Sequence, residues 1–426
     1  MKHSLRDTLV VGFALFSMFF GAGNVIFPPY LGLGCGSKWI LGFVCYYLAD
    51  IGLALLTIFA ILHSGGPSDL SRPLGKIPST LLMCANVLCV GPMLAIPRTA
   101  ASTFEMSVIP LTDRVNPVLF SFLFFLLIFL LSVRESAVVD IVGKILTPAL
   151  LIGLLILIIK GILDPIGAVP DRALVENVPS TGIEAGYQTM DVLAAIIFGI
   201  IVLKSVRDKG HSEPRDQYRV VAGASIVAGI SLLLVYLGLT YLGASTSAQF
   251  DLTVDRTNLL IFIVSHLLGR AGMIIFAIVV ALACITTAVA LVSSAADFFS
   301  TLSGKKLKYS WLTAAICIFS AVVSNFGLEQ IISIAAPILD VIYPPTLVLV
   351  VLAFFRDHIR SGRVYRLGVL GALLTSVLTV ADRYGLPFGF VEHLPLYSLG
   401  FAWVLPAVIL AVIGAVTSGK EKKAET

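Results

Sequence analysis

The sequence GAGNVIFPP at residues 21–29 interrupts an apolar stretch that extends from about residue 8 to residue 31. A helix needs about 20 apolar residues to cross a bilayer, so the length of this stretch predicts a membrane span. Residues 21–29 contain two glycines, an asparagine and two prolines, which disfavour a continuous helix. A broken helix is tolerated at membrane depth where it lines a cavity, and transporters build solute and ion sites from such breaks. We therefore predict that the first span is broken near residues 21–24 and contributes to a binding site.

The composition indicates an integral membrane protein. Of the 426 residues, 58% are hydrophobic and 13% are charged, and the mean hydropathy is +0.99. A soluble domain carries about 25% charged residues. Apolar runs recur along the whole chain, which predicts a polytopic protein rather than a soluble domain with one anchor. The net charge of +4 comes from short basic clusters between these runs and does not indicate a nucleic-acid partner. The six cysteines form no CxxC pair, so we expect them to pack as small apolar residues.

The hydropathy pattern predicts an all-α polytopic protein with twelve transmembrane helices. If the N-terminus is cytoplasmic, 21 of the 29 lysines and arginines fall in inner segments and 8 in outer segments. This asymmetry follows the positive-inside rule and predicts that both termini are cytoplasmic. Residues 258–268, between spans seven and eight, are expected to lie along the membrane surface or to fold back as a lid. The predicted spans are residues 8–31, 38–62, 78–104, 116–133, 138–161, 187–204, 220–243, 272–299, 310–326, 331–355, 364–381 and 396–416.

The positions of the interrupted spans suggest an internal repeat. Span six begins with GYQTMD at residues 186–191, which also disfavours a regular apolar helix. Two halves of five spans each, 1–161 and 187–355, would then both begin with a broken helix. Because five is odd, the halves would insert in opposite directions, as in transporters with inverted repeats and a site at the midplane. Residues 364–416 would be two additional helices, and residues 417–426 a cytoplasmic tail.

Uncharged groups in two spans are candidate ligands. Unwinding at residues 21–24 would expose N–H groups that favour an anion and carbonyl groups that suit Na⁺. The alternative is that the glycines only allow close helix packing. In span eight, Ala283, Thr286 and Thr287 place carbonyl and hydroxyl oxygens about one helical turn apart. The alternative there is that each threonine only bonds back to its own helix.

Charged residues at membrane depth are functional candidates because burying them is costly. Asp191 in span six and Asp340 in span ten have this position, and each has the alternative role of a hydrogen-bonded acid at a helix end. Asp50 and Arg98 are weaker candidates, and Arg98 is also placed to snorkel to the membrane interface. The sequence contains no nucleotide-binding, zinc-hydrolase or serine-hydrolase motif, and no cytoplasmic loop is long enough for an ATPase domain. We therefore expect a carrier driven by an ion gradient and not an enzyme.

Residues 12–29, 91–99, 186–191 and 282–288 together resemble the branched-chain amino acid:cation symporters (BrnQ-type, LIVCS carriers). The resemblance extends over all twelve spans. It implies the LeuT-like fold of the amino acid–polyamine–cation superfamily, with helices 1 and 6 broken. It also implies import of leucine, isoleucine and valine with Na⁺ by alternating access, without another cofactor, across the cytoplasmic membrane of a bacterium. Coupling to H⁺ through Asp191, or transport of another neutral amino acid on the same fold, is the main alternative; a channel or an intramembrane enzyme is the other.

The resemblance also implies the site residues. In LeuT-like carriers one sodium ion lies between the break in span one and an Ala-x-x-Thr-[Ser/Thr] pattern in span eight, which residues 283–287 match. The expected Na⁺ ligands are therefore Ser17, Phe20, Ala283, Thr286 and Thr287. The expected partners are the amino acid, a monovalent cation and the bilayer, and no nucleic acid. The expected substrate-binding residues lie in the two breaks and are Phe19, Phe20, Gly21, Ala22, Gly23, Asn24, Thr189, Met190, Asp191, Val192 and Leu193.

Overall fold

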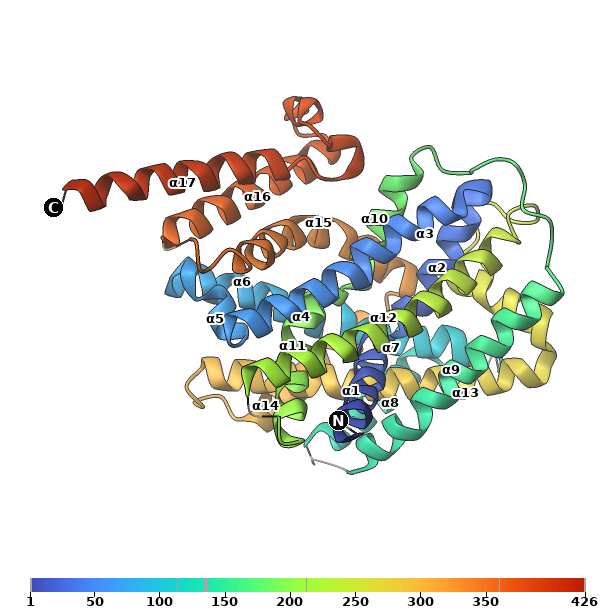
Figure 1. Ribbon diagram of the computed structural model, residues 1–426. Coiled ribbons are helices and arrows are strands. Elements are labelled where there is room, and N and C mark those ends of the chain that lie inside the picture. Colours follow the sequence, from blue (N-terminus) through green and yellow to red (C-terminus); the bar gives the residue numbers. More distant parts are fainter. Residues whose placement is uncertain (1, 113, 134–136, 212, 360, 425–426) are drawn as a thin grey trace.

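The computed structural model describes residues 2–112, 114–133, 137–211, 213–359 and 361–424. In these ranges the chain forms helices and connecting turns and contains no strands, and the long helices pack into one bundle (Figure 1). The α-helices are α1 (Lys2–Phe19), α2 (Ala22–Cys35), α3 (Trp39–Tyr47), α4 (Leu53–Ser64), α5 (Pro67–Ser71), α6 (Lys76–Leu88), α7 (Ala95–Thr103), α8 (Pro117–Val133), α9 (Ala137–Leu163), α10 (Val178–Thr189), α11 (Asp191–Asp208), α12 (Pro214–Ala244), α13 (Arg256–Leu302), α14 (Tyr309–Ser324), α15 (Leu328–Ala353), α16 (Gly362–Arg383) and α17 (Val404–Ala424).

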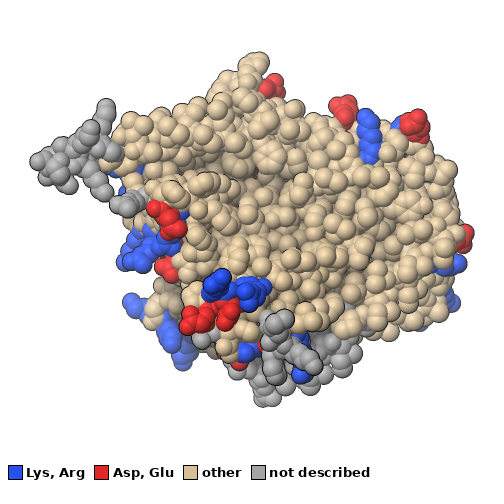
Figure 2. Space-filling view, in the orientation of Figure 1, with Lys and Arg blue, Asp and Glu red and all other residues tan. Residues whose placement is uncertain are grey.

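Several of these helices are apolar and long enough to span a membrane. Among the described residues, six helical stretches meet this criterion, and the bent pair α10–α11 makes a seventh. Figure 2 shows a wide face with few charged side chains, which instead gather at its margins. The protein is therefore a multi-pass membrane protein, and twelve spans remain a prediction. The six stretches are Gly23–Ser64, Lys76–Val108, Pro214–Ala244, Arg256–Leu302, Leu328–Ala353 and Gly362–Arg383; shorter apolar helices are Pro117–Val133, Leu150–Leu163, Tyr309–Ser324 and Val404–Ser418.

The first apolar stretch forms two helices that meet at residues 20–21. α1 ends at Phe19, Gly21 is extended (φ −105°, ψ −179°), and α2 starts at Ala22. The Gly21 N–H donates to the Phe19 carbonyl (3.0 Å), and the Asn24 N–H donates to the Gly21 carbonyl (3.1 Å). The two prolines that follow lie inside α2. α1 therefore ends just before Gly21, and the N–H groups in the first turn of α2 have no carbonyl one turn earlier in their own helix.

α10 and α11 are separated by a single residue. Met190 has a left-handed conformation (φ 69°, ψ 14°), and the two helices are bent by 40°. A left-handed residue other than glycine costs roughly 1–2 kcal/mol. Its neighbours therefore have to stabilise it.

Two further features position the site. The segment at 258–268 is helical and continues into the span as part of α13, with a kink at Gly269 (φ 64°, ψ −167°). α2 crosses α12 unusually closely: a Cβ on Gly32 would lie 1.9 Å from the Thr240 carbonyl oxygen, and a Cβ on Gly243 would lie 1.8 Å from the Pro29 carbonyl oxygen. Small residues allow such backbone contacts between membrane helices.

Candidate solute and cation site

The ends of α1 and α10 and the starts of α2 and α11 face one cavity of about 40 Å³. α7 and α13 complete its wall. Its polar side chains are one amide, one guanidinium, one carboxyl group and three threonine hydroxyls, and the remainder is mostly apolar. The lining residues are Met18, Phe19, Gly21, Gly23, Asn24, Val90, Ala95, Arg98, Thr99, Thr189, Met190, Asp191, Ala194, Phe198, Thr287 and Leu291.

Asn24 connects the two breaks. Its side-chain amide donates to Asp191 Oδ2 (2.8 Å) and to the Tyr236 hydroxyl (2.7 Å), and the residue is 2% exposed. Both amide hydrogens are therefore used. Asp191 is the first residue of α11, where the helix dipole favours a negative charge. The amide thus holds the start of α2 against the start of α11 and against α12.

Arg98 supports the second break from α7. Its guanidinium donates to the carbonyls of Gln188 (2.7 Å) and Thr189 (3.2 Å), at the end of α10. Carbonyls in the last turn of a helix lack helical partners, and a cation there is stabilised by the dipole. Arg98 is only 6% exposed, so the alternative that it snorkels to the interface is wrong. A Cβ on Gly23, in the first turn of α2, would lie 2.6 Å from Arg98 Nη2, so the guanidinium in this position requires the absence of a side chain there.

Asp50 approaches the second break from another side. It lies in the π-helical turn Leu48–Gly52 (η2) and is 0% exposed. The Thr189 hydroxyl is shared between Asp50 Oδ1 (2.7 Å) and the Gly186 carbonyl (2.6 Å). π-Helical turns are rare and frequent at functional sites. Arg98 and Asp50, the weaker candidates from the sequence, therefore both contact the end of α10.

The structure brings most of the predicted substrate-binding residues to the cavity. Phe19, Gly21, Gly23, Asn24, Thr189, Met190 and Asp191 line it. Phe20, Val192 and Leu193 are buried but are not part of the lining. The side chain of Ala22 lies outside the part of the chain that the structure describes.

Of the five predicted cation ligands, one lines the solute cavity. Thr287 lines the cavity, whereas Ser17, Phe20, Ala283 and Thr286 do not. The Thr286 hydroxyl donates to the Ala283 carbonyl (2.9 Å), within its own helix, as the alternative from the spacing suggests. A hydroxyl that donates one hydrogen bond still has lone pairs for a cation. This bond therefore leaves the cation hypothesis open.

Asp340 lies away from this cavity. Its carboxyl accepts from Arg383 Nη1 (2.7 Å), so the intramembrane acid from span ten is paired with the end of α16. It lines a separate cavity of about 210 Å³. These contacts favour the structural alternative for Asp340.

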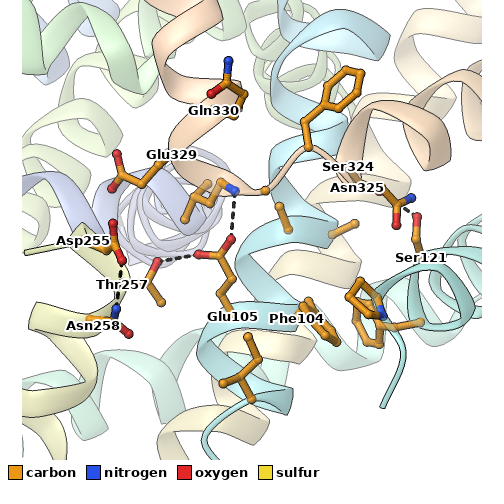
Figure 3. Close-up of a pocket in the computed structure, with 18 residues that line it drawn as sticks. Phe104, Glu105, Ser121, Asp255, Thr257, Asn258, Ser324, Asn325, Glu329 and Gln330 are labelled. Atoms are coloured by element: carbon orange, nitrogen blue, oxygen red, sulfur yellow. Dashed lines mark hydrogen bonds between the residues drawn. The ribbon is translucent and has the colours of Figure 1, made fainter. Parts of the chain in front are cut away.

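Two further cavities are also larger than the solute cavity. The larger, of about 520 Å³, is centred on Glu105, which accepts from the Leu328 N–H (2.8 Å) and the Thr257 hydroxyl (3.0 Å) (Figure 3). The other, of about 270 Å³, is lined by Gln188 and by Arg256, which forms an ion pair with Glu329. Gln188 therefore contacts both this cavity and, through its carbonyl, Arg98 beside the solute cavity.

Comparison with known proteins identifies the family. The family model described as "Branched-chain amino acid transport protein" matches residues 4–421. The chain belongs to this family. It is 36% identical to the branched-chain amino acid permease BraB of Bacillus subtilis, over 98% of this chain and 97% of the relative. It is also 36% identical to the branched-chain amino acid permease BrnQ of Escherichia coli, with the same coverage. The members are named as permeases and carrier proteins, so this family member is a transporter and not an enzyme.

Solved structures show the same fold. The inward-facing conformation of Mhp1 superposes with a TM-score of 0.65 at 12% identity and covers 97% of this chain and 91% of Mhp1. MhsT in complex with L-phenylalanine superposes with a TM-score of 0.58 at 15% identity and covers 95% of this chain and 98% of MhsT. The family member therefore has the LeuT-like transporter fold that the resemblance implied.

Asn24 offers a direct test of the contact between the breaks. Asn24→Asp replaces two donors with a carboxylate beside Asp191, and like charges in contact are strongly unfavourable in the membrane interior. We expect leucine uptake by proteoliposomes to fall about 100-fold, which corresponds to about 2.7 kcal/mol. Asn116→Asp is the matched control, because the side chain of exposed Asn116 accepts from the N–H groups of Val118 (2.8 Å) and Leu119 (3.4 Å), which aspartate also does. Wild-type uptake by Asn24→Asp would show that the amide bridge is dispensable.

Proposed function

We propose that this protein is a secondary active symporter that imports leucine, isoleucine and valine together with Na⁺. The observation that carries the proposal is the cavity at which two interrupted helices meet, lined by Asn24, Arg98 and Asp191. The names of the relatives supply the substrate class. The protein would lie in a bacterial cytoplasmic membrane with both termini inside. The halves 1–161 and 187–355 would each begin with one of the breaks, in keeping with an inverted repeat.

The groups that line the cavity match the chemistry of an amino acid that has an apolar side chain. The carboxylate would bind to the N–H groups at the start of α2, and the ammonium group would bind to Asp191 and to carbonyls at the end of α10. Met18, Phe19, Val90, Phe198 and Leu291 line it as well, and these would contact a branched aliphatic side chain. Hydrogen bonds would thus select the amino-acid backbone, and apolar contact would select the side chain.

The size of the cavity supports alternating access. A space of about 40 Å³ holds on the order of three water molecules. A leucine has nine non-hydrogen atoms and does not fit. The rings of Phe19 and Phe198 meet edge to face across α1 and α11, with centroids 5.7 Å apart. These helices would have to separate to admit the solute, and we propose that this separation is part of the transport cycle.

The proposed cation ligands are Ser17, Phe20, Ala283, Thr286 and Thr287. Three of them are on α13 and two are at the end of α1, so a bound Na⁺ would hold α1 against α13. Neutral oxygens suit a monovalent hard cation, and no residue would need to change charge. Binding of Na⁺ would thereby favour the arrangement of α1 that forms the solute cavity.

Thr287 tests the cation site because it also lines the solute cavity. For Thr287→Ala we expect the Na⁺ concentration that gives half-maximal leucine uptake to rise at least about 10-fold, since one oxygen ligand is lost. A Na⁺ titration of uptake measures this. Thr80→Ala is the control, because the hydroxyl of half-buried Thr80 donates to the Lys76 carbonyl within α6, away from the solute cavity. An unchanged Na⁺ dependence in Thr287→Ala would contradict the site.

Uptake of radiolabelled leucine by proteoliposomes tests the function as a whole. We expect saturable, Na⁺-stimulated uptake that isoleucine and valine compete with. Uptake that depends on a pH gradient and not on Na⁺ would favour an H⁺-coupled carrier. Competition by other neutral amino acids alone would favour another substrate on the same fold. Flux that rises linearly with leucine and shows no countertransport would indicate a channel.

A further inference from the structure

A second acid lies next to Asp191, behind the wall of the solute cavity. Asp50 in η2 and Asp191 at the start of α11 come from spans two and six, and η2 packs directly against α10 and α11. The Thr189 hydroxyl donates to Asp50, and Thr189 is two residues before Asp191, so the two carboxyl groups are neighbours and interact electrostatically. Asp191 lines the cavity and Asp50 does not. The pair therefore joins the solute cavity to the second span.

The surroundings of the pair leave one carboxyl oxygen without a donor. Asp191 Oδ2 accepts from Asn24, and Asp50 Oδ1 accepts from Thr189. Asp50 Oδ2 is completely buried and has no partner among the described residues. A buried acceptor without a donor costs about 1–3 kcal/mol, and more when it is charged. The donor that faces Asp50 is the buried Tyr46 hydroxyl, which also lacks a partner within hydrogen-bonding distance, and one such hydroxyl does not stabilise an ionised Asp50 beside an ionised Asp191.

The charges around the pair identify what is missing. Arg98 on α7 is the cation that faces both acids. The other titratable groups that interact with them are the hydroxyls of Tyr46 and Tyr47 on α3, Tyr236 on α12 and Tyr343 on α15. Two carboxylates in contact cannot both be ionised without a large penalty. With one proton on the pair, a single negative charge remains, and Arg98 balances it. The buried site is then neutral, as the membrane interior requires.

We propose that Asp50 and Asp191 bind one proton between them and that this proton holds the start of α11 against the second span. One carboxyl group donates its O–H to the other, which is the ionised acceptor, and the orphaned oxygen is thereby satisfied. When the proton leaves, two negative charges are in contact beside a single Arg98. Their repulsion pushes the start of α11 away from η2 and enlarges the cavity that Asp191 lines. This site is separate from the proposed Na⁺ ligands and does not depend on them.

Infrared spectroscopy of the purified protein tests the proton directly, without any transport measurement. The carbonyl stretch of a protonated carboxyl group is separated from that of a carboxylate. We expect wild type to show a protonated carboxyl band at neutral pH that is lost as the pH is raised. Asp50→Asn and Asp191→Asn are each expected to lack this band, because the remaining acid ionises next to Arg98. Asp340→Asn, which removes an acid paired with Arg383, is the matched control and should keep the band.

Three outcomes would overturn the proposal. They are a neutral-pH band that persists in both Asp50→Asn and Asp191→Asn, the loss of the band in Asp340→Asn, and the absence of any band in wild type. If the last result is accompanied by Na⁺-dependent changes in the carboxylate bands, Na⁺ and not a proton occupies the pair. If Asp50→Asn and Asp191→Asn do not fold, Asp50→Glu is a further variant. It keeps both acids, and we expect it to shift the frequency of the protonated carboxyl band.

Discussion

Replacing Arg98 with methionine is expected to reduce leucine uptake at least about 100-fold and to lower the thermal stability of the purified protein. Methionine keeps much of the volume but removes the donors to Gln188 and Thr189. The carbonyls at the end of α10 then lose their partners, and the buried acid Asp191 loses its facing cation. Removing one partner of a buried ionic contact costs about 3–5 kcal/mol. Proteoliposome uptake and a thermal unfolding midpoint in detergent measure the two effects.

Arg98→Lys separates charge from geometry. Lysine keeps the positive charge but is a compact donor that cannot reproduce the planar fork of a guanidinium. If charge and geometry both matter, we expect leucine uptake by Arg98→Lys to lie between that of wild type and that of Arg98→Met. If the two hydrogen bonds to α10 dominate, we expect its uptake to be close to that of Arg98→Met. Arg114→Met, at an exposed position, is the matched control and should behave as wild type. Arg98→Met with normal uptake and a normal unfolding midpoint would show that the guanidinium does not support the break.

The first break illustrates how much of the site can be predicted from sequence. Glycine and asparagine within an apolar run are visible without a structure, and they locate the interruption to within a residue or two of Gly21. The same signal favours prolines 28–29 as breakers, yet these lie inside α2 and do not end it. Composition therefore finds the break, while the local hydrogen bonds decide which residue ends the helix.

Arg98 and Asp50 show what the sequence does not contain. Hydropathy gives the depth of a residue along its span, but it does not give the direction in which the side chain points. Arg98 is near the end of a span by sequence, which suggests snorkelling, but α7 turns it toward the carbonyls of α10. Asp50 becomes significant only because span six places Thr189 and Asp191 beside it. For Arg98 and Asp50 alike, the sequence shows only a charged residue within an apolar span. Their partners in the structure, Gln188 for Arg98 and Thr189 for Asp50, are 90 and 139 residues away along the chain.

Gly243→Ala is expected to have the largest effect on folding. The added Cβ would lie 1.8 Å from the Pro29 carbonyl oxygen and 2.5 Å from its carbon, and backbone atoms cannot rotate away as a flexible side chain can. Gly32→Ala meets the Thr240 carbonyl oxygen at 1.9 Å on the same crossing. Overpacking costs typically about 1–3 kcal/mol, and α2 and α12 have to separate to relieve it. We expect each variant to lower the thermal unfolding midpoint and the yield of monodisperse protein.

The same variants should reduce transport by more than their loss of stability explains. Asn24 on α2 bonds to Tyr236 on α12, so separating these helices also pulls Asn24 away from one of its two acceptors in the site. Because Gly32 and Gly243 lie on one crossing, we expect the double variant to be less harmful than the sum of the single effects. Gly153→Ala on α9 is the control, since its Cβ would contact nothing within 4 Å and alanine favours a helix. If Gly243→Ala unfolds at the wild-type midpoint and retains uptake, α2 and α12 do not approach as closely as described, and the position of Asn24 between the two breaks has to be revised.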